Sequence, residues 1–373
     1  MTLIRVVFAA LTVSVMLTAG CATYPPVSPT SITIERQGSF YVGGRQVTGA
    51  GTADLVSTPV PGNAGETFWI DQMYVQYQIP PNARKLPIVL VHGGGGTGAV
   101  WETTPDGRDG FQTILLRRGY PVYIVDAPRG GRSGFPSFNG EIGKLDDKQQ
   151  VIPPRTLRPG HQYAWARWRM GPQHPEVFPV QAFPMQSFEP FMKAVRPLIA
   201  DDAEVIARAL VELLDRIGPA VVVTHSNGGL WGWLAAARSP NVRGIVSYEP
   251  VFVFPPGEVE LTGPARSGNQ PAGTTIKAEE FANLVKIPVQ VVFGDNIPKT
   301  PVRIQAADGR RLQVEDSALF INALNRRGGK ASTLLLPDAG LRGNSHFAYQ
   351  DFNNVDVADQ LFAFLTKYGL DAR

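Results

Sequence analysis

The sequence predicts an α/β fold with a mostly parallel central sheet, helices on both faces and a cap insertion. Three observations predict it. Strand-like apolar runs alternate with helical stretches from residue 86 onward. One of these runs leads directly through a sharp turn into a helix. The alternation stops between residues 133 and 198, where prolines and aromatic residues are frequent. Such alternation brings strands together in parallel and packs the helices on both faces of the sheet.

The expected elements follow in chain order. Two early strands, at 32–47 and 68–80, are expected to form an antiparallel edge, and the second alternates apolar and polar residues. Further strand-like runs lie at 86–91, 121–126, 220–224, 243–248, 288–294 and 333–336. Helices are expected at 202–217, 230–238 and 355–367.

The N-terminus predicts export and a lipid anchor. Arg5 precedes an apolar run, 6–17, that is too short to cross a bilayer and is typical of a signal peptide. Cleavage after residues 1–20 would leave Cys21, which follows small residues as in the signals of bacterial lipoproteins; ordinary secretion is the alternative. By the same analogy, Ala22, where an aspartate is absent, favours sorting to the outer membrane, and the expected location is the outer membrane or the periplasm.

The chain after Cys21 is expected to hold a tether and one domain. Residues 21–31 are rich in proline, serine and threonine, as tethers are, and 32–373 form the domain, with a cap insertion at about 133–198. Hydrophobic residues make up 43% and charged residues 18% of the 373, which is a globular composition. Because lysines and arginines are dispersed, the basic stripe of a nucleic-acid-binding protein is missing despite the net charge of +3. The single cysteine excludes an internal disulfide, and the oligomeric state stays open.

The segment 224–228, Thr-His-Ser-Asn-Gly, predicts a nucleophile elbow. It follows the apolar run 220–223 and precedes a helical stretch, so Ser226 would stand in a strained turn that exposes its hydroxyl. The backbone N–H of Asn227, at the helix N-terminus, could then donate to an oxyanion. Thr224 occupies a position where glycine is more usual, and a plain strand-turn-helix is the alternative.

The glycine cluster after 86–91 predicts the rest of an oxyanion hole. His92 opens the loop His-Gly-Gly-Gly-Gly-Thr-Gly, whose bare backbone N–H groups can approach a ligand closely. We expect Gly94 or Gly95 to supply the second donor, because hydrolases with such an elbow take one from this loop. A phosphate cradle is the alternative, but the Lys-Ser/Thr that ends a phosphate-binding loop is missing.

Elimination among five histidines selects His346 as the general base. His92 belongs to the glycine loop, and His225 neighbours the serine and should lie beneath it, since adjacent side chains point to opposite sides. His161 and His174 fall in the irregular insertion. His346 follows the last strand-like run and precedes the last helix, which is the place of the base in the order serine, acid, histidine.

Two residues could supply the acid. Glu249 follows the strand-like run 243–248, and Asp295 follows 288–294. Both would lie at the carboxyl end of a strand, where open α/β sheets build their sites. Asp295 occupies the more usual place, so the residues alone leave the choice open.

The whole mature chain resembles an α/β hydrolase. The stretch 92–133, with its segments Trp-Glu-Thr-Thr-Pro-Asp-Gly-Arg and Arg-Gly-Gly-Arg-Ser, resembles a small branch of bacterial esterases, the 713-like group. In that branch the acid is a glutamate after the sixth strand. The resemblance therefore favours Glu249 over Asp295 and gives the nucleophile and base roles to Ser226 and His346.

The chain departs from this branch in the glycine loop. The best-known member has an adjacent pair of cysteines where this sequence has Gly94 and Gly95. Glycine has more backbone freedom to lose when the loop becomes ordered, so we expect a less rigid hole before substrate binds.

The insertion is expected to cap an apolar acyl or aryl pocket. Its aromatic residues include Tyr163, Trp165, Trp168, Phe178, Phe183, Phe188 and Phe191. Most of them would pack among themselves, and Trp101, just after the glycine loop, is the better pocket candidate. Arg167 and Arg169 beside Trp168 could hold an acidic substrate group, although a solvated surface is the more ordinary place for them.

These features predict a serine hydrolase that cleaves carboxylic esters through an acyl-enzyme on Ser226, without metal or organic cofactor. His346 would transfer the proton, Glu249 would orient it, and the substrate would be a small-molecule or lipid-like ester. A thioesterase, lactonase, polyester depolymerase or peptidase would use the same parts. From a different class, a non-catalytic ligand-binding lipoprotein predicts a degraded triad, whereas every member is present here.

Overall fold

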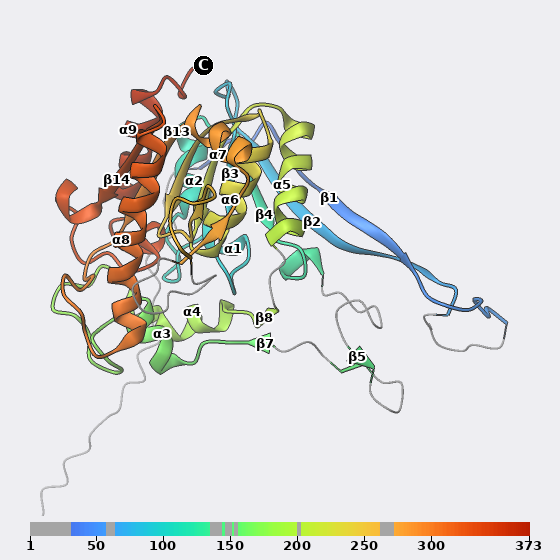
Figure 1. The fold of residues 1–373 in the computed structure, drawn as a ribbon, viewed down its shortest axis with the longest axis horizontal. Helices are drawn as coiled ribbons and strands as arrows, with labels where there is room; N and C mark the ends of the chain where they lie inside the picture. The colour runs from blue at the N-terminus through green and yellow to red at the C-terminus, as the bar shows by residue number, and fades with distance from the viewer. Residues whose placement is uncertain are drawn as a thin grey trace, which may run out of the picture.

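The computed structural model describes residues 31–56, 64–134, 144–145, 151–152, 156–199, 203–261 and 272–373. Within these residues, an eight-stranded sheet forms the centre of the molecule (Figure 1). Its strands in chain order are β1 (Arg36–Thr48), β2 (Thr67–Ile79), β3 (Ile88–Val91), β4 (Val122–Asp126), β9 (Ala220–His225), β10 (Val242–Tyr248), β13 (Pro288–Phe293) and β14 (Lys330–Leu335).

The sheet is antiparallel at one edge and parallel elsewhere. Its strand order is β1-β2-β4-β3-β9-β10-β13-β14. The pairs β1–β2 and β2–β4 are antiparallel, and every other neighbouring pair is parallel. The predicted fold class, with its antiparallel edge, is confirmed. β1 and β2 also extend past the other strands as a two-stranded arm (Figure 1).

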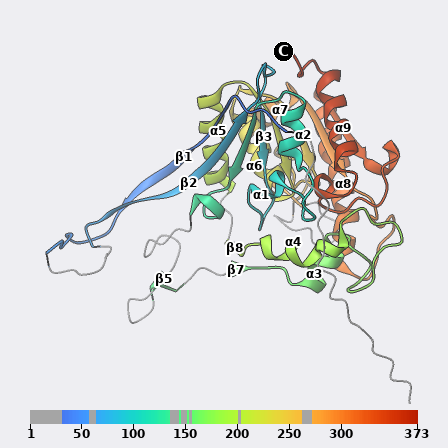
Figure 2. The same cartoon turned by 180° about the vertical axis from the view of Figure 1, so that it is seen from behind.

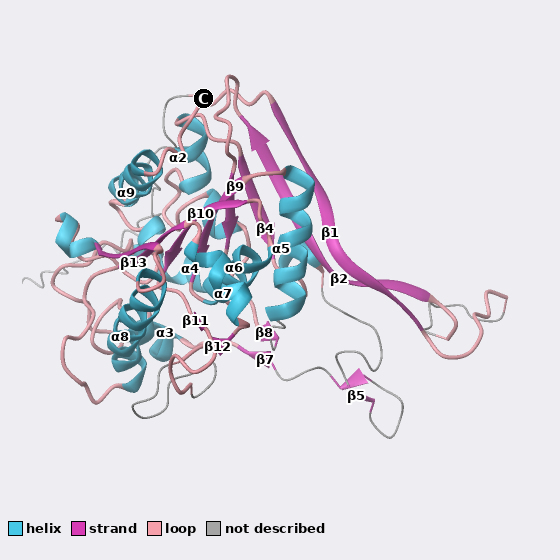
Figure 3. Cartoon of the chain, turned by 45° about the horizontal axis from the view of Figure 1, so that its top comes forward, coloured by secondary structure: helices cyan, strands magenta, loops and turns pink. Residues whose placement is uncertain are grey.

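Helices cover both faces of the sheet (Figure 3). They are α1 (Ala99–Glu102), α2 (Phe111–Arg117), α3 (His161–Arg167), α4 (Phe188–Ala194), α5 (Ala203–Ile217), α6 (Asn227–Arg238), α7 (Ala278–Val285), α8 (Gln305–Asn325) and α9 (Asn354–Lys367). Alternate residues of β3 belong to opposite cores, because successive strand side chains point to opposite faces. Val89 and Val91 pack with α5 to α8, whereas Ile88 and Leu90 pack with α2 and α9.

The described part of the predicted insertion contains α3 and α4. A two-stranded pair, β7 (Thr156–Leu157) and β8 (Leu198–Ile199), flanks them. These elements lie together below the central sheet in the view of Figure 2. Two further short pairs join β5 (Lys144–Leu145) to β6 (Val151–Ile152) and β11 (Val253–Phe254) to β12 (Thr274–Thr275).

The predicted signal peptide, Cys21 and almost all of the predicted tether lie outside the described residues. Across the part of the chain that the structure describes, no helix combines the length and apolar character needed to span a bilayer.

Candidate active site

Ser226 lies at the turn between β9 and α6. Its backbone, with φ 53° and ψ −123°, occupies a region that residues with a side chain rarely adopt. Three backbone hydrogen bonds hold it there. Its N–H donates to the carbonyl of Tyr248 at 2.8 Å, and its carbonyl accepts from the N–H of Gly229 at 2.9 Å and of Val251 at 3.3 Å. Thr224 fits in place of the usual glycine because α6 carries Gly232 opposite it, where a Cβ would lie 2.5 Å from Cγ2 of Thr224.

The glycine loop packs directly against this turn. A Cβ on Gly93 would lie only 2.9 Å from the Cβ of Ser226, so a larger residue would force the loop away from the turn. None of the described residues accepts a hydrogen bond from the backbone N–H of Gly94, Gly95 or Asn227. All three residues line the same cavity as Ser226. Their amides are therefore available to a ligand in that cavity.

His92 and Arg196 hold the glycine loop from two sides. The N–H of Ala127 donates to Nε2 of His92 at 3.0 Å, which leaves Nδ1–H to donate to the carbonyl of Gly93 at 2.7 Å. Burial, aided by Arg196, lowers the pKa of His92 to about 4, so the ring is neutral and this tautomer is fixed. Arg196, at the end of the cap, donates through Nε to the carbonyl of Gly96 at 2.9 Å.

The structure brings His346 and Glu249 into direct contact. Nδ1 of His346 lies 2.7 Å from Oε2 of Glu249, and both side chains are buried. Glu249 follows β10 with a positive φ of 48°, and Nε2 of Gln313 donates to its carbonyl at 2.7 Å. The N–H of His346 donates to the carbonyl of Trp168 in the cap at 3.0 Å.

Two arginines surround the Glu249 carboxylate. Arg169 binds it with both terminal nitrogens, with Nη1 2.9 Å from Oε2 and Nη2 bonded to Oε1. Arg310 of α8 places Nη1 at 3.8 Å from Oε2. The backbone N–H of Gly294 donates to Oε1 at 3.0 Å. Arg169 was expected to be solvated; instead it is only 1% exposed, because it pairs with a carboxylate that lies under the cap.

These contacts set the charges of the pair. Burial by itself would raise the pKa of Glu249, but Arg169, His346 and Arg310 outweigh burial and hold the pKa well below its usual value. The pKa of His346 is lowered well below its usual value by burial and then by Arg310 and His225, against the opposing effect of Glu249. The resting pair is therefore an ionised carboxylate and a neutral imidazole, and Nδ1–H of the ring donates to the carboxylate.

Asp295, the alternative acid, serves as a turn residue. Its Oδ1 accepts from the N–H of Asn296 and its Oδ2 from the N–H of Gly343, each at 2.8 Å. Its backbone carbonyl accepts from Nε of Arg169 at 2.7 Å. The carboxylate of Asp295 is thus occupied by backbone amides, whereas that of Glu249 contacts the imidazole.

Buried polar side chains fix the loop that carries His346. Asp351 accepts hydrogen bonds from the N–H of Ser345 at 2.7 Å and from its hydroxyl at 2.8 Å. Burial raises the pKa of Asp351 to about 7, against the lowering effect of these bonds. Arg108, from the sequence stretch that resembles the esterase branch, donates to the carbonyls of Asp351 and Gln350, each at 3.1 Å. That stretch therefore contributes to positioning the loop.

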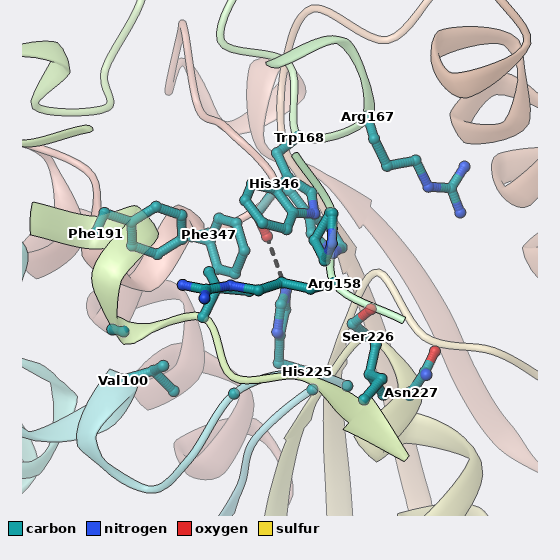
Figure 4. Close-up of a pocket in the computed structure, with 18 of the residues that line it drawn as sticks. Val100, Arg158, Arg167, Trp168, Phe191, His225, Ser226, Asn227, His346 and Phe347 are labelled. Atoms are coloured by element: carbon teal, nitrogen blue, oxygen red, sulfur yellow. Dashed lines mark hydrogen bonds between the residues drawn. The ribbon is translucent and has the colours of Figure 1, made fainter. Parts of the chain in front are cut away.

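Ser226 and His346 open on one cavity of about 530 Å³ beneath the cap (Figure 4). Its apolar walls include Trp168 and Phe191, as expected of cap aromatics. Trp101, in contrast, does not line the cavity and corrects our expectation. It is completely buried and stacks on Tyr349 with ring centroids 4.0 Å apart.

His225 also departs from its expected place beneath the serine. Its ring lines the cavity and lies against the ring of His346, with centroids 4.4 Å apart. Its Nε2–H donates to the carbonyl of His346 at 3.0 Å, the dashed line in Figure 4. Burial lowers the pKa of His225 to about 3, so the ring is neutral. The strained turn redirects the side chains on either side of it, and strict strand alternation therefore fails here.

In the described residues, no group of three or more His, Cys, Asp or Glu side chains is placed to hold a metal ion. A parallel sheet that ends in a strained serine turn, facing an imidazole and a carboxylate, is the arrangement of the α/β hydrolases. The chain belongs to the alpha/beta hydrolase fold family, whose model matches residues 87–281.

Two relatives match over nearly their whole length. A protein named probable secreted lipase phiG, from Fungal sp. (strain ATCC 74256), is 30% identical over 357 residues, which cover 88% of this chain and 93% of the relative. A solved structure titled as that of a novel bacterial esterase is 34% identical, has a TM-score of 0.74, and is matched over 92% of this chain and 99% of its own.

Proposed function

We propose that this chain is a serine esterase that hydrolyses carboxylic esters through an acyl-enzyme on Ser226. His346 takes the hydroxyl proton through Nε2 and returns it to the leaving alcohol, while Glu249 holds the imidazole through Nδ1. The N–H groups of Asn227 and of Gly94 or Gly95 stabilise the oxyanion. Water then attacks the acyl carbon and frees Ser226.

One observation carries the proposal. A neutral imidazole, fixed by an ionised carboxylate, opens on the same cavity as a serine in a strained turn and three backbone amides without partners among the described residues. The hydroxyl of Ser226 forms no hydrogen bond with the described residues. Contacts between nucleophile and base are often loose before substrate binds, and the proposal requires this one to form in the complex. The lipase and esterase named above support an ester as the substrate.

Replacing the nucleophile tests the proposal. Ser226→Ala should lower the turnover of p-nitrophenyl acetate by roughly four to six orders of magnitude, while circular dichroism stays that of the folded protein. An organophosphonate that labels active serines should add its mass to the wild-type chain at Ser226. Comparable turnover in the variant would remove Ser226 from the mechanism. Parallel assays with a thioester, a lactone and an amide separate the esterase from the other hydrolases that use the same groups.

We propose further that the chain is exported and anchored by a lipid on Cys21. The signal-peptide pattern of residues 1–20 and the secreted relative support export. In a bacterial host that processes lipoproteins, Cys21→Ser should move the protein from the membrane fraction to the soluble fraction. Unchanged membrane retention would contradict the anchor.

A further inference from the structure

Every charged side chain that lines the active-site cavity is cationic. Arg158, Arg167 and Arg310 all line it, and no aspartate or glutamate among the described residues does. The two histidines of the lining, His225 and His346, are neutral because burial lowers the pKa of each. A cleft lined by one sign of charge concentrates ions of the opposite sign.

None of these arginines has an anion of its own among the described residues: Arg158 donates through Nη2 to the carbonyl of Met192 at 3.2 Å. Arg310 is only 3% exposed; its Nε donates to the carbonyl of Arg167 at 3.0 Å, and none of the described residues accepts a hydrogen bond from its Nη2. Arg167 donates through Nη1 to the carbonyl of Ala306 at 3.4 Å and forms no ion pair with a described residue. The one carboxylate that pairs with Arg310 is Glu249, which Arg169 already binds with two hydrogen bonds.

Arg167, Arg169, Arg310 and Glu249 therefore form a cluster under the cap with three guanidinium groups and one carboxylate. A buried charge without a counter-ion is unfavourable, and neighbouring like charges add to the cost. Burial, and next the charge of Arg167, lower the pKa of Arg310 well below its usual value. An arginine stays protonated in proteins, so the imbalance persists until an anion enters the cavity.

We propose that the substrate carries, besides its ester, an ionised carboxylate that binds to Arg167 and Arg310 while the ester carbonyl lies at Ser226. This inference rests on the proposed function. In Figure 4, the aromatic side chains of Phe191 and Phe347 lie on one side of His346 and Arg167 lies on the other. The aromatic wall accepts the apolar part of such a substrate, and the arginines accept its charge. The preferred substrates are thus half-esters of dicarboxylic acids.

Matched pairs of esters test the inference. Monomethyl adipate and monomethyl terephthalate each carry a carboxylate, and the corresponding methyl esters with a primary amide in its place are neutral and of similar shape. Wild-type protein should cleave the anionic member with a kcat/KM at least about tenfold higher, as expected for charge-assisted hydrogen bonds. Methanol release measures both.

Variants locate the preference on the surface of the cavity. Arg167→Gln should bring the ratio of anionic to neutral kcat/KM close to one, and Arg167→Lys, which keeps the charge, should retain part of it. Arg208→Gln is the matched control, because this exposed arginine of α5 does not line the cavity; it should leave the ratio unchanged. A measurement on unmodified protein guards against misfolded variants. Free adipate should inhibit p-nitrophenyl acetate cleavage far more strongly than adipamide, and added salt should weaken that inhibition.

The outcomes separate this inference from the proposed function. If the wild-type protein cleaves the neutral esters as fast as the half-esters, and adipate inhibits no better than adipamide, the anion site is refuted while the esterase stands. If Arg208→Gln lowers the preference as much as Arg167→Gln, the site is also refuted, because general charge would explain it. If no ester is cleaved at all, both proposals fail together.

Discussion

Different kinds of group surround His346 on its two sides, the Glu249 side and the side of Ser226 and the glycine loop. On the side of the proposed acid, guanidinium groups from the cap and from α8 hold Glu249, so contacts between charged residues far apart in the sequence set the geometry. On the side of the proposed oxyanion hole, Ser226 packs against a short glycine loop, and this loop offers backbone amides to the cavity. On the Glu249 side, activity should therefore be most sensitive to a substitution that removes charge and keeps the shape. On the glycine-loop side, it should be most sensitive to a substitution that adds volume and keeps the charge.

The largest effect should come from removing the charge of Glu249. Glu249→Gln keeps the shape, but its amide can donate to Nδ1 of His346 and favour the wrong tautomer, and it leaves Arg169 and Arg310 without their anion. We expect p-nitrophenyl acetate turnover to fall by about four orders of magnitude. Steady-state kinetics measure the loss, and thermal unfolding shows whether the protein still folds.

Asp295→Asn is the matched control for that change. Its side-chain oxygen can still accept one of the two backbone N–H bonds that Asp295 accepts now, and the side chain does not contact the imidazole, so turnover should fall by less than about tenfold. If Asp295→Asn lost more activity than Glu249→Gln, the acid role would belong to Asp295, and the contacts around Glu249 would not be those that hold His346.

On the oxyanion side, Gly93→Ala adds one methyl group and no charge. Its Cβ would meet the Cβ of Ser226 at 2.9 Å and the carbonyl of His225 at 3.1 Å, so the loop must move away from the turn. We expect kcat to fall about a hundred- to a thousandfold, as on losing one oxyanion donor. In Gly94→Ala the nearest atom, at 2.6 Å, is Nδ2 of the Asn227 side chain. Because this side chain can rotate aside, the loss of kcat should be smaller than in Gly93→Ala. Equal losses in the two variants would contradict this account of the hole.

The same contrast explains what the sequence could predict. The elbow and the glycine loop are contiguous motifs next to buried strands, so Ser226 and Gly94 could be located from local patterns. The neighbours of Glu249 come from distant segments and could not be. Arg310 had one usable signal: it shares a helix face with Ser317 and Ile321, at spacings of seven and eleven residues, and all three are buried. A cation on the buried stripe of a helix suggests a buried partner.

Trp101 shows where a local pattern gave a wrong prediction. Its position directly after the glycine loop predicts a place in the cavity wall, but α1 turns its side chain into the core. Its indole ring stacks on the ring of Tyr349, which lies more than two hundred residues later in the sequence. Which face of a short helix is buried depends on such distant partners, and local sequence does not contain them.

The smallest effect should appear as a shift in pH dependence. In the proposed mechanism His346 must be neutral to accept the Ser226 proton, so activity should be lost as the pH falls through the pKa of His346. Because that pKa is lowered, kcat/KM for a neutral ester should persist below pH 6.5, the usual value for histidine. The charged and titratable groups that contribute around the ring are Glu249 at the end of β10, Arg310 on α8 and His225 on β9.

Arg310→Gln sharpens this prediction, since it removes a cation that disfavours imidazolium. The pKa of His346 should rise, and the acid limb of kcat/KM should move to higher pH while the limiting value at high pH changes less. Arg311→Gln is the control, because that neighbour on α8 pairs with Asp308 outside the cavity lining. A pH–rate profile of the wild type and both variants measures the shift. An unmoved limb in Arg310→Gln would mean that Arg310 does not lower the pKa of His346, and a wild-type limb near pH 6.5 would mean that neither burial nor Arg310 lowers it.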